Sequence, residues 1–133
     1  MKNFTSNNQK TGKLGEDIAC KYLEGKGFII KDRNYTKKWG EIDIVAQKGN
    51  EIYFIEVKAV TCVTFDFLEH SNGRIRPEEN MHPWKMKRLR RTVETYLIHN
   101  RIGNTPWRFD LALVYLNMTE RTARVKMIEN IIL

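Results

Sequence analysis

The chain has 133 residues, of which 41% are hydrophobic and 11% aromatic, so it suits one globular domain and is not an intrinsically disordered chain. No apolar run approaches the roughly 20 residues of a membrane-spanning helix. The first ten residues lack the apolar centre of a secretory signal. Two cysteines outside any CxxC pair argue against a zinc site or a disulfide framework. We therefore expect a reduced, cytoplasmic protein with no membrane contact.

Basic residues outnumber acidic ones by 23 to 16, and the excess is concentrated in one segment. Between His82 and Arg101 there are six basic side chains and one acid, Glu94, so this segment carries about five of the seven net positive charges. Such a stretch favours a polyanionic partner such as nucleic acid.

The predicted elements begin with a flexible N-terminal arm over residues 1–10 and a helix over 11–24, whose apolar residues recur at helical spacing. Three strands rich in β-branched and aromatic residues follow, over 28–35, 41–46 and 52–60. Residues 62–81 have no clear period and are predicted to be a long loop. A second helix from Pro83 to about His99 and two strands, over 107–116 and 121–132, complete a single α/β domain spanning 11–133.

The second and third predicted strands carry charged residues on one face. If Gly49-Asn50 is a two-residue hairpin turn, Asp43 lies opposite Glu56 and Glu41 lies opposite Lys58. Side chains alternate along a strand, so these four charged residues share a face. The other face takes apolar residues expected in the core, namely Ile42, Ile44, Tyr53, Ile55 and Val57.

Two directly opposed carboxylates repel each other, and a fold tolerates them readily when a cation lies between them. Asp43 and Glu56 therefore indicate a divalent-metal site, and their oxygen ligands suit magnesium, calcium or manganese rather than zinc, with Mg²⁺ or Mn²⁺ the expected cofactor. Lys58 points to the same side, where it can orient a water, as phosphodiester hydrolysis requires. The alternative is structural, with Glu41 and Lys58 forming an ordinary cross-strand ion pair on a solvent-facing sheet.

Five short runs, in order and with compatible spacing, resemble the YraN-like family of bacterial proteins. These runs are Gly15-Glu16-Asp17-Ile18-Ala19, Arg33-Asn34-Tyr35, Gly40-Glu41-Ile42-Asp43-Ile44-Val45, Phe54-Ile55-Glu56-Val57-Lys58 and Arg108-Phe109-Asp110. That family belongs to the PD-(D/E)xK nuclease superfamily, near the archaeal Holliday-junction resolvases. The resemblance implies a restriction-endonuclease-like fold, with a central mixed β-sheet flanked by helices. It also implies a metal-dependent endonuclease that acts on DNA in preference to RNA, branched DNA included.

The resemblance assigns roles to individual residues. Asp43 matches the metal-binding Asp of the superfamily, while Glu56 and Lys58 match the acidic and catalytic residues of its (D/E)xK element. Glu16 matches a first-helix glutamate that resolvase-like members add to the site. From the sequence alone it could also be a first-turn acid favoured by the helix dipole. Lys85 falls where relatives carry a lysine in the second helix, and resolvase-like relatives suggest a homodimer.

Nucleic-acid contacts are predicted for basic side chains of the second helix and the long loop: Lys85, Lys87, Arg88, Arg91, Arg74 and Arg76. An ordinary solvated helix face and a solvated loop are the alternatives. For the whole protein, two other functions stay open. One is a catalytically inactive nucleic-acid-binding protein of the same fold, and the other is an assembly protein whose positive face docks an acidic partner.

Overall fold

The computed structural model describes residues 7–62 and 82–133. The elements within these ranges follow the predicted order of helix, three strands, helix and two strands. They are α1 (Asn7–Gly25), β1 (Ile29–Lys37), β2 (Gly40–Lys48), β3 (Glu51–Thr61), α3 (Pro83–His99), β4 (Trp107–Asn117) and β5 (Thr122–Ile128). The predicted loop over 62–81 lies outside the described residues apart from Cys62. Neither α1 nor α3 has the length and apolar character needed to cross a membrane.

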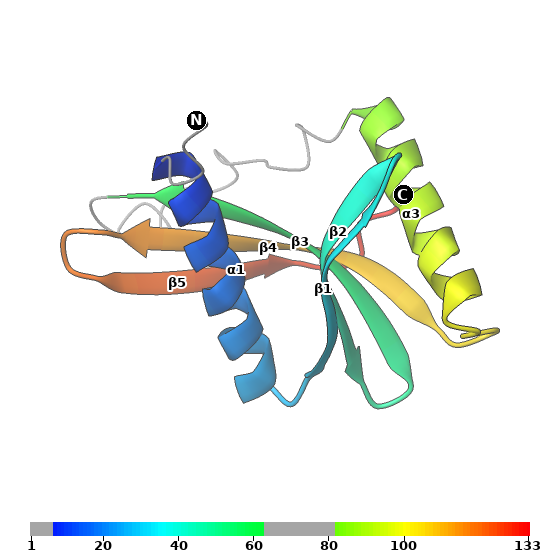
Figure 1. The fold of residues 1–133 in the computed structure, drawn as a ribbon. Helices are drawn as coiled ribbons and strands as arrows, with labels where there is room; N and C mark the ends of the chain where they lie inside the picture. The colour runs from blue at the N-terminus through cyan, green and yellow to red at the C-terminus, as the bar shows by residue number, and fades with distance from the viewer. Residues whose placement is uncertain (1–6, 63–81) are drawn as a thin grey trace.

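The five strands form one mixed sheet in the order β1-β2-β3-β4-β5 (Figure 1). Neighbouring strands are antiparallel except β3 and β4, which run parallel. A parallel pair needs a long crossover connection, and α3 lies within that connection. β4 is buried throughout from Phe109 to Asn117, as its nearly continuous apolar sequence predicts. The mixed sheet that the family resemblance implies is therefore confirmed.

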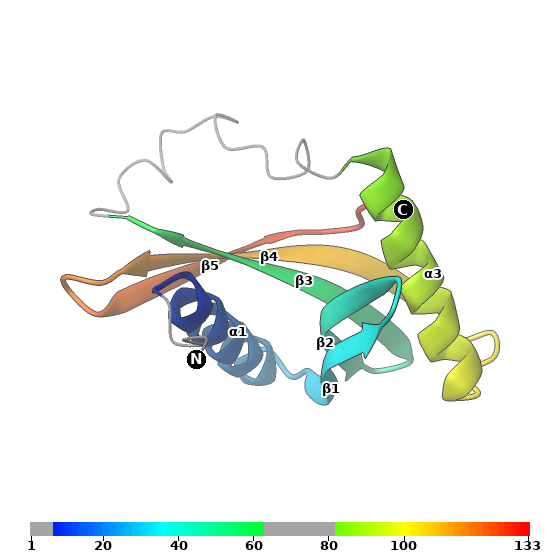
Figure 2. The same ribbon diagram turned by 45° about the horizontal axis from the view of Figure 1, so that its top comes forward.

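α1 and α3 cover opposite faces of the sheet (Figure 2). The core beneath α1 is built from Ala19, Cys20, Leu23, Ile44, Tyr53, Ile55 and Val114, among others. The core beneath α3 is built from Val45, Ile52, Phe54, Leu89, Val93, Tyr96 and Phe109, among others. Alternation along β3 places Tyr53 and Ile55 beneath α1 and Phe54 beneath α3. Glu56 and Lys58 continue the α3 side of that alternation.

The β2–β3 hairpin has the predicted register. Lys48 pairs with Glu51, and Gly49 in the turn has a φ of 60°, which glycine adopts without steric cost. The ladder extends as far as Ile44 opposite Ile55 and ends there. Asp43 and Glu56 thus lie where the two strands separate, rather than in a continuous ladder.

Two details differ from the sequence-based expectation. Ile42 packs in the cluster beneath α3 instead of joining Ile44 beneath α1. β2 is no longer hydrogen-bonded to β3 beyond Ile44, so it twists toward α3 and simple alternation no longer fixes the face. In addition, α1 begins at Asn7 rather than at Thr11, which makes residues 7–10 of the predicted arm helical. These polar residues extend the helix before its apolar stripe begins, so hydrophobic periodicity does not reveal them.

α1 approaches β3 closely at Gly15. A Cβ added at Gly15 would lie 2.7 Å from the Cβ of Ala59, which is closer than side chains pack. Gly12, less than one turn earlier, has no neighbouring atom within 4 Å of the same position. Glycine at position 15 therefore sets the distance between α1 and β3, and with it the position of Glu16.

We expect Gly15→Ala to lower the free energy of unfolding by about 1–2 kcal/mol, because overpacking outweighs the gain in helix propensity. Gly12→Ala is the matched control on the same helix and should raise that free energy by roughly 0.5–1 kcal/mol. Urea unfolding followed by circular dichroism measures both values. Equal stabilisation by the two substitutions would show that Gly15 does not hold α1 against β3.

Candidate functional site

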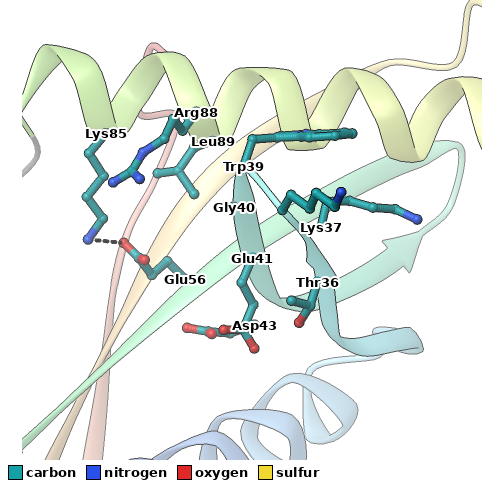
Figure 3. Close-up of a pocket in the computed structure, with 11 residues that line it drawn as sticks. Thr36, Lys37, Trp39, Gly40, Glu41, Asp43, Glu56, Lys85, Arg88 and Leu89 are labelled. Atoms are coloured by element: carbon teal, nitrogen blue, oxygen red, sulfur yellow. Dashed lines mark ion pairs between the residues drawn. The ribbon is translucent and has the colours of Figure 1, made fainter.

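A cleft of about 310 Å³ lies between the β1–β2 hairpin, β3 and α3. Figure 3 shows Glu56 meeting Lys85 of α3, whereas the carboxylates of Glu41 and Asp43 lie farther from that helix. The cleft is lined by Thr36, Lys37, Lys38, Trp39, Gly40, Glu41, Asp43, Glu56, Lys85, Arg88 and Leu89. The structure thus brings together Asp43, Glu56 and Glu41, three of the charged residues that the hairpin pattern places on one face.

Asp43 occupies the point where β2 leaves β3. Its Oδ2 accepts a hydrogen bond of 2.8 Å from the backbone N–H of Val57, beyond the last paired residues of the ladder. Burial raises the pKa of Asp43 to about 7 in spite of this hydrogen bond. Neighbouring negative charges raise the pKa further, in the order Glu16, Glu56 and Glu41. A cation beside Asp43 would offset this cost.

Glu56 is half-buried on β3 and forms an ion pair with α3. Its Oε2 lies 3.5 Å from Nζ of Lys85, as the dashed line in Figure 3 marks. The sequence places Lys85 at the border of the buried stripe of the helix, but it does not show which acid the lysine meets. Lys85 therefore belongs to the cleft itself, beside the proposed metal ligand.

Lys58 lies two residues beyond Glu56 on the same side of β3, which is about 6.5 Å along a strand. It is exposed and is not among the residues that line the cleft. Across residues 7–62 and 82–133, no ion pair joins it to Glu41. The strands have already separated at that level, so the cross-strand pair proposed as the structural alternative does not form.

Glu16 lies well inside α1, which begins at Asn7, so its interpretation as a first-turn acid is wrong. Its Oε1 lies 3.7 Å from a guanidinium nitrogen of Arg33. With its side-chain amide turned so that the nitrogen faces the acids, Asn34 would donate to Glu16 at 3.1 Å and to Glu41 at 3.2 Å. Burial raises the pKa of Glu16. Glu16 does not line the cleft but supports it from the α1 side, next to Asp43.

The basic side chains of α3 are placed unequally. Lys87, Arg88 and Arg91 are exposed, and of these Arg88 lines the cleft. Arg74 and Arg76 of the predicted loop lie outside the described residues. The cleft is therefore bordered by exposed positive charge along α3.

Trp39 lines the cleft but has no motif that identifies it in the sequence. It lies in the turn between the paired residues Lys37 and Gly40, with the guanidinium of Arg91 4.0 Å from its ring centroid. A Cβ added at Gly40 would lie 2.5 Å from Oγ1 of Thr92, so glycine lets this turn pack against α3. The one sequence signal for Trp39 is its residue type, because a tryptophan in a two-residue turn cannot pack into either core of the sheet.

The carboxylates of the cleft fit a magnesium-type site better than a protein cage for zinc. In the part of the chain that the structure describes, no group of three or more His, Cys, Asp or Glu side chains is arranged to hold a metal ion. Magnesium usually takes one or two carboxylates and completes its coordination with water and phosphate oxygens. Asp43 and Glu56 supply that number on one cleft.

Comparison with known proteins gives a family. The model of UPF0102, an uncharacterised protein family, matches residues 15–114, from the first of the five sequence runs to beyond the last. A UPF0102 protein of Clostridioides difficile is 39% identical over 110 residues, which cover 83% of this chain and 89% of the relative. A UPF0102 protein of Moorella thermoacetica is 37% identical over 126 residues, which cover 95% of this chain and 98% of the relative. These names state no activity.

The raised pKa of Asp43 predicts a stability that depends on pH. The carboxyl group titrates near 3.9 when the chain is unfolded and at about 7 in the folded protein. Between these values the folded state binds more protons, so stability falls as pH rises from about 4 to 7. Asp43→Asn keeps an acceptor for Val57 and should flatten this decline. Urea unfolding at pH 5 and pH 8 in EDTA measures the effect.

Glu24→Gln is the matched control, because Glu24 is an exposed acid on α1. It should retain the pH dependence of the wild type. A decline in Asp43→Asn as steep as in the wild type would show that another group causes it.

Proposed function

This chain belongs to the uncharacterised protein family UPF0102, and we propose that it is a metal-dependent nuclease of the PD-(D/E)xK type. One observation carries the proposal. Asp43 and Glu56 face a single cleft beside a basic helix, and burial holds the pKa of Asp43 near 7. The mixed sheet with a helix on each face supports a restriction-endonuclease-like fold as part of this proposal.

In this proposal Asp43 and Glu56 hold Mg²⁺ or Mn²⁺. The bound ion would polarise the scissile phosphate and lower the pKa of a water molecule. Asp43 is pre-positioned for this role by the N–H of Val57, which fixes one carboxylate oxygen. Glu16 would add negative charge next to Asp43 from the α1 side, and the side-chain amide of Asn34 would hold the Glu16 carboxylate by a hydrogen bond.

The remaining cations would act on the substrate. Lys58, on the same side of β3 as Glu56, would orient the attacking water. Lys87, Arg88 and Arg91 would bind backbone phosphates of DNA along α3. The homodimer and the cytoplasmic location stay predictions.

The alternative is a nucleic-acid-binding protein of the same fold without catalysis. The ion pair between Lys85 and Glu56 favours this alternative, because a lysine already neutralises one of the two proposed metal ligands. The exposure of Lys58 outside the cleft favours it too. Metal binding and cleavage separate the two functions.

We expect Mn²⁺ to bind the wild-type protein in a calorimetric titration and to bind Asp43→Ala at least tenfold more weakly, since that variant loses a charged ligand. Asp110→Asn is a useful control, because Asp110 is also buried but lies outside the cleft, paired with Arg108 at 3.2 Å. It should bind Mn²⁺ as the wild type does. Absence of binding in the wild type would refute the proposed metal site.

We expect the wild type to cleave at least one of linear, flapped or four-way DNA with Mg²⁺ or Mn²⁺. Lys58→Ala should lower the cleavage rate by roughly 100-fold or more while Mn²⁺ binding is retained, because orienting the water is a role in the reaction alone. Lys126→Ala, which removes an exposed lysine on β5, should cleave normally. Normal cleavage by Lys58→Ala would exclude the proposed role of this lysine.

A further inference from the structure

Trp84, in the first turn of α3, is open to solvent. It is 57% exposed, although a packed tryptophan buries roughly 150–250 Å² and stabilises a fold accordingly. A single exposed apolar side chain is ordinary in a folded protein. The neighbours of Trp84 therefore decide whether its exposure has a use.

Those neighbours are cationic and aromatic, and they connect Trp84 to the cleft. The guanidinium of Arg88 lies 4.3 Å from the centroid of the indole, and Arg88 itself lines the cleft that contains Asp43. The ring of His82 is parallel to the indole within 4°, with centroids 6.2 Å apart. Trp84 is thus joined through Arg88 to the cleft whose lining includes Glu41, Asp43 and Glu56.

A second pair of the same kind follows along α3. The guanidinium of Arg91 lies 4.0 Å from the centroid of Trp39, which also lines the cleft. Arg88 and Arg91 are three residues apart on the helix, so they lie on neighbouring parts of one face. Figure 3 shows Trp39 and Arg88 beside the same stretch of α3. Indole faces and guanidinium groups therefore alternate along this edge of the cleft.

Alternating aromatic faces and cations match the chemistry of a single-stranded nucleic acid. Bases stack on aromatic side chains, and phosphates bind the intervening cations. In a continuous duplex the base faces are already stacked on one another, so an indole has no base to contact. We infer that Trp84 stacks an unpaired base, and that this protein binds nucleic acid with a single-stranded segment, such as an overhang or a flap, beside the cleft. This inference rests on the proposed function for the presence of a scissile phosphate, whereas the stacking itself requires no cleavage.

Binding measured in EDTA tests the stacking separately from cleavage. The probes are fluorescein-labelled single-stranded DNA, single-stranded RNA of the same sequence, a duplex with a single-stranded overhang, and a blunt duplex. Fluorescence anisotropy gives the dissociation constant of each. We expect the wild type to bind at least one single strand, and the overhang duplex, more tightly than the blunt duplex.

Trp84→Ala should weaken binding to the single-stranded and overhang probes roughly tenfold and leave the blunt duplex unchanged, as loss of one stacked base does. Trp84→Phe keeps an aromatic face and should restore most of the affinity. Ile98→Ala is the matched control, since Ile98 is 74% exposed on the same helix, about 21 Å along its axis. It should bind all probes as the wild type does.

The inference is overturned if Trp84→Ala binds the single-stranded probes normally, or if it loses affinity equally for the blunt duplex. It is also overturned if the wild type prefers none of the single-stranded probes. Whichever single strand depends on Trp84, DNA or RNA, identifies the substrate sugar and supports the inference. Trp84-dependent binding without Mn²⁺ binding would support the inference and refute the nuclease. Mn²⁺ binding and cleavage without any dependence on Trp84 would refute the inference and support the nuclease.

Discussion

The hydrogen bond from the N–H of Val57 to Asp43 is the contact on which the cleft depends. In a continuous ladder, β2 would keep pairing with β3 beyond Ile44 and Ile55, and no space would open between them. Where β2 leaves, the carboxylate of Asp43 accepts the N–H of Val57 at 2.8 Å. A buried N–H without a hydrogen-bond partner destabilises a fold. By accepting the N–H of Val57, Asp43 removes this penalty where the strands separate. The same side chain then supplies an acid at the centre of the opening, with a pKa of about 7 because of its burial.

Both helices hold the separated strands in place, from opposite faces of the sheet. On the α3 side, the turn at Gly40 packs on Thr92, and Tyr35 makes an edge contact with Tyr96, with ring centroids 4.9 Å apart. On the α1 side, the guanidinium of Arg33 donates a hydrogen bond of 2.8 Å to the carboxylate of Asp17. The β1–β2 hairpin is therefore fixed between the two helices. One cleft therefore depends on residues of α1, the β1–β2 hairpin and α3, which lie far apart in the sequence.

Rules that act over a few neighbouring residues predict the order of the elements and the β2–β3 register. The element order follows from hydrophobic periodicity, and the β2–β3 register follows from Gly49 in a two-residue turn. The end of the ladder, the side taken by Ile42 and the partner of Lys85 depend on how β2 bends toward α3. That bend results from packing between elements distant in sequence, which neither alternation nor turn chemistry encodes. The pattern thus indicated which acids meet, but not that they meet where the strands part.

The charge distribution links the two parts of the proposed function, metal binding by the acids and nucleic-acid binding by the basic helix. The protein carries a formal charge of +7, yet its cleft has an acidic floor, which would repel a phosphate held along α3. Lys85 lies between the two regions, with its Nζ 3.5 Å from Glu56. A divalent cation on the floor would neutralise Glu56 and leave Lys85 free to meet a phosphate. A phosphate beside Lys85 would in turn supply a further oxygen ligand for the cation. Under the proposed function each ligand would therefore favour the other, and by linkage the coupling would be equal in both directions. A site of this design would bind a metal most tightly when the polyanion is present.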